Sequence, residues 1–211
     1  YSPLAISNSL CYNFYNMPIE IKIPGIGNGI LKFTKDSISY KNSTLKYSEI
    51  THISCRMEFI SHTFLPNEGI VSFTFFSKTK KIDVGFTTSV TVTAKEATEI
   101  LTQIFSITKS VMVPLILKDL VRRIVDDGET VKIGHISFDK EGYSIKKLFR
   151  KNDKVLWTEN LIEPKLIQGR YVLFRPKNDN FVYFTECSLE NPNVILIPEL
   201  LQILHSMLPS R

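Results

Sequence analysis

The residue types that most often perform chemistry in proteins are sparse in this chain. Its four histidines and three cysteines are His52, His62, His135, His205, Cys11, Cys55 and Cys187. None of them belongs to an HExxH, GxSxG or CxxC motif. The pattern therefore predicts a protein that is not an enzyme and that holds no metal and no cofactor. It also predicts that the cysteines are buried or semi-buried thiols in a reducing compartment.

A cationic segment in the second half of the chain is the strongest candidate for a binding site. Its proposed contact residues are Lys146, Lys147, Leu148, Phe149, Arg150, Lys151 and Lys154. An apolar tip flanked by cations fits an anionic membrane surface, where each cation contributes about 1 kcal/mol. The alternative is a solvated hairpin whose Phe149 packs back on the protein.

A smaller basic patch consists of Lys78, Lys80 and Lys81, at a predicted turn. Lysines at the turns and edges of sheets often prevent pairing with other chains, so this patch also has a structural explanation. The net charge of +5 is spread over both halves, which gives mild attraction to anionic surfaces. A nucleic-acid-binding protein would show a sharper basic stripe, so nucleic acid is not a favoured partner.

Two stretches, Gly29 to Tyr47 and Gly134 to Trp157, repeat the same pattern of residues. Six pairs match at a constant offset: Gly29 with Gly134, Phe33 with Phe138, Lys35 with Lys140, Asp36 with Glu141, Ser39 with Ser144 and Lys41 with Lys146. The second copy then has five extra residues, after which Tyr47 matches Trp157. Further on, Gly69 recurs as Gly169, and Glu99 as Glu199. The chain therefore reads as an internal duplication, and we expect Trp157 to occupy a core position like that of Tyr47.

Each half is predicted to contain about seven short strands followed by an amphipathic helix. The pattern changes from the strand period to the helical period at 94–107 and again at 194–208, and a connecting helix with buried Leu117, Leu120, Val121 and Ile124 is expected at 111–125. The glycine-rich segment 25–29 is interpreted as a turn, because a strand follows it where a phosphate loop would need a helix. The predicted organisation is an N-terminal arm at 1–19, a first domain at 20–110, a connecting helix at 111–128 and a second domain at 129–211.

This arrangement resembles two tandem pleckstrin-homology (PH)-like domains, each a β-barrel or sandwich closed by a C-terminal helix. Three features of the second half resemble a poorly characterised family of bacterial PH-like proteins: Arg122-Arg123-Ile124 followed by 128–134, Val155-Leu156-Trp157-Thr158-Glu159, and Pro192-Asn193-Val194. The resemblance covers 129–208 and, more weakly, 20–107. PH domains that bind phosphoinositides use basic residues on the loop between their first two strands, and the matching loop 24–29 has none.

The resemblance implies a fold and no activity. We expect a non-catalytic binding or scaffolding module that contacts a protein partner or an anionic membrane surface, in the cytoplasm or peripheral to a membrane. One alternative is a histone- or nucleic-acid-associated chaperone, because GILKFTKDSISYKNS in the first half also resembles the PH-like domains of eukaryotic histone chaperones. Another is a small-molecule sensor with a pocket between the domains.

Overall fold

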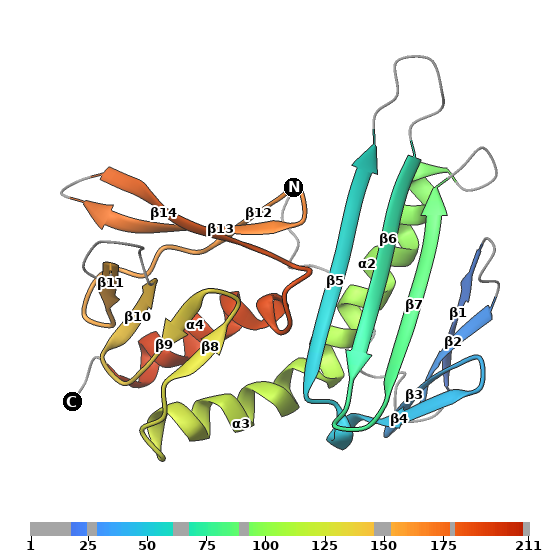
Figure 1. Cartoon of the computed structure of the whole chain (residues 1–211), viewed down its shortest axis with the longest axis horizontal. Coiled ribbons are helices and arrows are strands. Elements are labelled where there is room, and N and C mark those ends of the chain that lie inside the picture. Colours follow the sequence, from blue (N-terminus) through green and yellow to red (C-terminus); the bar gives the residue numbers. More distant parts are fainter. Residues whose placement is uncertain are drawn as a thin grey trace. The chain divides into compact units, whose positions relative to one another are not determined.

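The computed structural model describes residues 18–24, 29–60, 68–88, 93–145, 153–177 and 180–208. Most of the predicted arm at 1–19, most of the turn at 25–29 and the cationic residues 146–151 lie outside these ranges. The chain divides into two compact units, one formed by 1–51 and 59–115 and the other by 52–58 and 116–211. Figure 1 gives the order of the elements along the chain.

The first unit begins with a four-stranded antiparallel meander in the order β1-β2-β3-β4. The strands are β1 (Ile19–Ile23), β2 (Gly29–Phe33), β3 (Ser37–Tyr40) and β4 (Ser43–Lys46), and a single 3-10 turn, η2 (Tyr47–Glu49), follows. Buried and exposed residues alternate because successive side chains of a strand point to opposite faces. The buried face includes Leu31, Phe33 and Ile38, each fully buried.

A second antiparallel sheet has the order β5-β6-β7. Its strands are β5 (His52–Ile60), β6 (Glu68–Phe76) and β7 (Lys81–Thr88), and residues 52–58 of β5 are grouped with the second unit. In β7 every second residue is buried, which is the strict alternation of a half-buried strand. Helix α2 (Ala94–Val111) packs on this sheet, where the ring of Phe105 meets that of Phe73 at 6.4 Å.

A break at Met112 separates α2 from α3 (Val113–Val125). The predicted gap at 108–110 is helical, so the interruption is shorter than expected. Pro114 explains its position, because proline has no N–H to donate to a carbonyl one turn earlier. Leu117, Leu120 and Ile124 are buried as predicted, whereas Val121 is half-buried. Among the described helices none alone is long and apolar enough to span a membrane; α2 and α3 pass that test only as a bent pair, by length and composition.

The second unit repeats this order of elements. A meander β8-β9-β10-β11 is followed by a three-stranded sheet β12-β13-β14 and a C-terminal helix. The bounds are β8 (Val131–Ile133), β9 (Ile136–Phe138), β10 (Gly142–Ile145), β11 (Asp153–Leu156), β12 (Lys165–Ile167), β13 (Arg170–Lys177), β14 (Asn180–Ser188), η3 (Val194–Leu196) and α4 (Ile197–Met207). Pro198 lies in the first turn of α4, where a missing N–H costs nothing. The prediction of a mainly β chain with a C-terminal helix is confirmed, while the described strands form four separate sheets and no closed barrel.

The same side-chain hydrogen bond closes the first sheet of both units. The hydroxyl of Tyr47 donates to the carbonyl oxygen of Thr34 at 2.8 Å. The indole Nε1–H of Trp157 donates to the carbonyl oxygen of Asp139 at 2.9 Å. Thr34 and Asp139 are equivalent residues of the two copies, so a phenol in one copy and an indole in the other satisfy the same backbone group. Trp157 is buried, as predicted.

Backbone bonds around this ring are duplicated too. The N–H of Tyr47 donates to the carbonyl of Asp36 at 2.8 Å, and the N–H of Trp157 donates to the carbonyl of Glu141 at 3.1 Å. Two residues further on, the carboxylates of Glu49 and Glu159 each accept the backbone N–H three residues before them. The two copies therefore share hydrogen bonds as well as a strand order, which supports the internal duplication.

Candidate functional site

Two of the described basic residues of the predicted sites, Lys154 and Lys81, form ion pairs with nearby acids. Lys154 on β11 forms ion pairs with Asp139 at 3.1 Å and with Glu141 at 2.7 Å. Its ammonium group is therefore neutralised by acids of the β9–β10 turn. The remaining residues of the predicted segment lie outside the described residues: Lys146, Lys147, Leu148, Phe149, Arg150 and Lys151.

The smaller patch occupies the turn between β6 and β7. Lys78, Lys80 and Lys81 are all exposed. Lys81 pairs with Asp83 two residues along β7 at 2.7 Å. Ser77 ties the turn, because its N–H donates to the carbonyl of Lys80 at 2.8 Å. These lysines lie at the end of a hairpin, as their structural explanation requires.

One histidine lies near a thiol in the described part of the chain, in the second unit. Nε2 of His135 lies 2.6 Å from the hydroxyl of Thr185, and Nδ1 lies 3.6 Å from Sγ of Cys187. Burial raises the pKa of the Cys187 thiol, and burial raises that of Cys55 to about 12. Thiols held protonated in this way are not activated nucleophiles. Within the described ranges, no group of three or more His, Cys, Asp or Glu side chains could hold a metal ion.

An exposed aromatic surface on β13 and β14 was not predicted from the sequence. We call it the aromatic face and define it by Val172, Phe174, Phe181 and Tyr183. Phe174 pairs directly with Tyr183 across the two strands, and Phe181 lies two residues before Tyr183, so the three rings share one side of the sheet. Phe181 is 66% exposed and Tyr183 is 59% exposed, the highest values among the exposed large apolar side chains of the described chain.

A β-bulge sets which residues of β14 reach this face. The register shifts between Leu173 and Phe174, so β14 carries one extra residue at this point. Phe184 and Thr185 are consequently both buried, although they are adjacent in sequence. Before the bulge the alternation places Phe181 and Tyr183 outward.

The first unit has polar residues at the equivalent positions. When the two copies are aligned at the offset that relates Gly69 to Gly169, Lys81 corresponds to Phe181 and Asp83 corresponds to Tyr183. Both pairs are exposed, so they occupy the same outward side of equivalent strands. An ion pair in β7 is thus replaced by two exposed aromatic rings in β14.

The neighbouring strand shows the same change. Ser72 and Thr74 on β6 correspond to Val172 and Phe174 on β13, and all four are half-buried. At these positions of the three-stranded sheet, polar residues of the first copy are replaced by apolar or aromatic residues in the second. The alignment of the two copies contained this signal, which reading each copy by itself did not reveal.

Charged residues at the rim of the aromatic face are mostly neutralised. Arg170 pairs with Glu186 on the side of the sheet that carries the aromatic face, whereas Arg175, which pairs with Asp153, follows Phe174 on β13 and points to the opposite side. Lys165 on β12 has no acidic partner among the described residues, and its ammonium group lies 5.7 Å from the centroid of the Phe174 ring. Among the described residues, the face therefore combines exposed aromatic rings with a single uncompensated cation, Lys165. Comparison of the chain with protein-family models, with curated proteins and with solved structures finds no match.

Proposed function

We propose that the protein is a non-catalytic binding module, PH-like in each half, whose aromatic face holds an extended segment of a partner protein. The PH-like assignment is supported by seven strands followed by a helix in each copy of the described chain. The binding role is carried by the aromatic face, where the second copy exposes rings and the first copy has an ion pair. Exposed apolar surface of this kind commonly marks a site of protein interaction.

The edge of the sheet suggests how the partner binds. Within the described chain β14 is the last strand of its sheet. Its nine residues, NFVYFTECS, include no lysine and no proline, which are the residues that usually protect an edge strand. A partner segment can add to such an edge as a further strand, with main-chain hydrogen bonds giving affinity and alternate side chains giving specificity.

The charge at the rim indicates the chemistry of that segment. Because Arg170 is already paired with Glu186, Lys165 is, among the described residues on this side of the sheet, the cation left for a partner to neutralise. We therefore infer a segment with apolar side chains at alternate positions, to cover Phe181 and Tyr183, and with a glutamate that extends across β14 toward the ammonium group of Lys165, which lies over the ring of Phe174. An oppositely charged partner also binds faster and is better oriented.

A library of random peptides selected on the whole protein tests this proposal. The enriched peptides should alternate apolar residues and carry an acid, and their affinity can be measured by fluorescence anisotropy. The decisive variant is Phe181→Lys with Tyr183→Asp, which installs the pair that β7 already carries. Burial of one phenylalanine contributes roughly 1.5 to 3 kcal/mol, so the variant should bind at least about tenfold more weakly.

The matched control is Leu156→Lys, which removes an exposed leucine from β11 in the other sheet of the same unit. It should bind the selected peptides like the wild type, and circular dichroism should show both variants folded. Failure to enrich any peptide, or undiminished binding by the Phe181→Lys, Tyr183→Asp variant, would show that the aromatic face is not the site.

The same experiment tests the membrane alternative. A variant with Lys146, Lys147, Arg150 and Lys151 changed to serine should retain peptide binding. If that variant loses peptide binding, and also loses binding to vesicles of anionic lipid that the wild type shows, the cationic segment is the functional surface and the proposal is wrong.

A further inference from the structure

The register of the β13–β14 hairpin decides which backbone groups of β14 face its open edge. In an antiparallel pair of strands, residues that exchange hydrogen bonds alternate with residues whose N–H and C=O groups point away from the partner strand. Lys177 pairs with Asn180 across two intervening residues, and a pair that closes so short a turn is a hydrogen-bonded one. The first copy shows this bond at the equivalent residues, where the N–H of Ser77 donates to the carbonyl of Lys80 at 2.8 Å.

Two residues of β14 direct their main-chain groups toward the open edge. Counted from the closing pair, Val182 is bonded to β13, whereas Phe181 and Tyr183 turn their N–H and C=O groups away from it. Pro176 agrees with this alternation, because proline has no N–H to donate and its pair is Phe181. In the described chain no other strand borders β14 on that side. The residues whose rings are most exposed on the aromatic face therefore also offer edge-facing main-chain groups.

The β-bulge changes this alternation further along β14. Beyond the bulge, the N–H of Leu189 donates to the carbonyl of Gly169 at 2.9 Å, so it points to the β13 side. Alternation then makes Glu186 and Ser188 the residues with edge-facing groups. The step from Tyr183 to Glu186 is three residues, whereas the steps before and after it are two.

A regular strand cannot bond to the edge on both sides of this interruption. Its bonding groups repeat every two residues, about 6.8 Å, so a step of three residues puts every later group out of phase. Further along, the carbonyl of Leu189 already accepts the N–H of Cys55 at 2.8 Å. A segment that adds to β14 therefore has Phe181 and Tyr183 for its main-chain hydrogen bonds and gains no regular bond beyond the bulge.

An edge of two residues favours an antiparallel segment. In antiparallel pairing, the residues directly opposite Phe181 and Tyr183 each exchange two hydrogen bonds, so three consecutive residues of the partner make four bonds. In parallel pairing the bonds are slanted, and the same four bonds are spread over five residues of the partner. Because each residue that is fixed loses conformational entropy, the antiparallel segment makes these bonds with the smaller loss.

Antiparallel pairing also fixes which side chains of the segment meet the rings. Residues directly opposite each other in a pair project to the same side of the sheet. The first residue of the three then lies beside Tyr183 and the third beside Phe181, while the middle side chain projects to the other side. Apolar side chains are thus needed at the first and third residues, where they cover the exposed rings.

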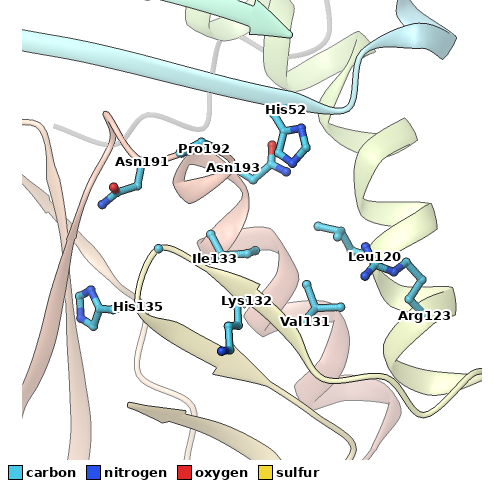
Figure 2. A pocket seen from close by; sticks show the side chains of 11 residues that line it. His52, Leu120, Arg123, Val131, Lys132, Ile133, His135, Asn191, Pro192 and Asn193 are labelled. Atoms are coloured by element: carbon cyan, nitrogen blue, oxygen red, sulfur yellow. The ribbon is translucent and has the colours of Figure 1, made fainter. Parts of the chain in front are cut away.

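The open edge of β8 offers less to such a segment. β8 is the last strand of its sheet and borders a cavity of about 640 Å³, whose wall includes His52 and Asn193 (Figure 2). Ile133 closes the two-residue turn to β9, so of the three residues of β8 only Lys132 has edge-facing main-chain groups. A segment at β8 would pair with one residue, whereas β14 offers two.

We propose that the partner segment pairs antiparallel with Phe181 and Tyr183 alone, through a core of three residues whose first and third side chains are apolar, and that the bulge at Phe184 ends the pairing. This rests on the proposed binding role of the aromatic face, and it adds the length, direction and register of the segment. The bulge belongs to the copy that exposes the rings, because β6 and β7 pair without a shift of register.

Backbone methylation of a peptide tests this register. Each amide nitrogen of the tightest-binding peptide from the random library is methylated in turn, which removes one donor and leaves the side chains unchanged. Methylation at either of the two apolar core residues should weaken binding at least about tenfold, because it removes a hydrogen bond and places a methyl group against the edge. Methylation at the residue between them is the matched control and should change the affinity by less than about threefold.

Amide hydrogen exchange of the ¹⁵N-labelled protein detects the same bonds from the side of β14. With the peptide at 100 times its dissociation constant, the N–H groups of Phe181 and Tyr183 should exchange up to about 100-fold more slowly than in the free protein. The exchange rates of Glu186 and Ser188 should stay unchanged. Val182, which is bonded to β13 with or without the peptide, reports any general slowing.

The outcomes separate this inference from the binding role on which it rests. Slowed exchange at Glu186, or a third sensitive nitrogen in the peptide, would show that pairing continues past the bulge and would overturn the inference. Sensitive nitrogens at the residues next to the apolar ones would show a parallel segment and would overturn it too. In both cases, loss of binding by the Phe181→Lys, Tyr183→Asp variant would still support the aromatic face. Undiminished binding by that variant, or a library that yields no peptide, would remove both proposals.

Discussion

The shared hydrogen bond of the two copies predicts that tyrosine can replace tryptophan at residue 157 better than phenylalanine can. Trp157 is 2% exposed, its indole packs on Tyr143 with ring centroids 5.6 Å apart, and Nε1–H satisfies the carbonyl of Asp139. In the first copy the tyrosine hydroxyl at Tyr47 reaches the equivalent carbonyl. The bond from Tyr47 to Thr34 therefore shows how a tyrosine at residue 157 would donate its hydroxyl to the carbonyl of Asp139.

The magnitudes follow from two losses. Replacing an indole with a six-membered ring leaves unfilled volume that costs about 1 to 2 kcal/mol. Leaving the part-buried carbonyl of Asp139 without its donor costs about another 1 to 2 kcal/mol. Trp157→Phe should lose both, about 2 to 4 kcal/mol in total, and Trp157→Tyr should lose mainly the first. The free energies of unfolding can be compared by urea denaturation followed by far-ultraviolet circular dichroism, because both variants lack the only tryptophan.

An equal cost for the two variants would refute this reasoning. It would mean that a phenol at 157 does not reach Asp139, and that the two copies share a strand order without sharing the geometry of the ring. Tyr47→Phe is the matched test in the first copy, since it removes the hydroxyl alone and should cost about 1 to 2 kcal/mol.

Two further predictions concern the second unit. Gly142→Ala should destabilise it by about 2 to 3 kcal/mol in urea denaturation, because the new Cβ would lie 2.0 Å from the carbonyl oxygen of Val155. Gly85→Ala is the control and should be nearly neutral, because its Cβ would lie 3.5 Å from Cβ of Ser72. Equal effects of the two substitutions would contradict this prediction. Burial, with Glu159 adding to it, raises the pKa of Tyr143 from 10.0 to about 12, so the stability that depends on the neutral phenol is complete below pH 10 and is lost, by about 2 to 3 kcal/mol, as the pH rises toward 12. Tyr143→Phe should make the alkaline part of the pH–stability curve less steep, and an unchanged slope would contradict that assignment.

Much of the fold was predictable because its signals are local. The alternation in β7 and the helical spacing in α2 and α4 depend on residues next to one another in sequence. The duplication added information that neither copy has alone, since it placed Trp157 in the core by its match with Tyr47. The position of the break between α2 and α3 at Met112 was predicted less accurately, because it depends on the single missing N–H of Pro114.

The candidate sites depend on contacts that local sequence does not contain. Lys154 was expected to be part of a cationic segment, and its ion pairs with Asp139 and Glu141 arise only when β10 and β11 pair. A simple alternation would place Thr185 outward with Tyr183, and the bulge instead turns it inward. The cavity joins residues as far apart in sequence as His52 and Asn193, so no sequence window could have outlined it.

The difference between the two copies is informative because stability does not require it. Both copies have a buried, hydrogen-bonding ring at the residue that closes the first sheet, Tyr47 in one and Trp157 in the other. Loss of that ring would lower the free energy of unfolding. The exposed positions of β7 and β14 carry no such constraint, since an exposed ion pair contributes at most about 1 kcal/mol and most surface changes contribute about half of that. Replacing Lys81 and Asp83 by aromatic rings therefore gains the fold little and adds a risk of unwanted association through an unprotected edge. The partner segment proposed above would cover Phe181 and Tyr183 and would thereby account for two exposed rings on that edge.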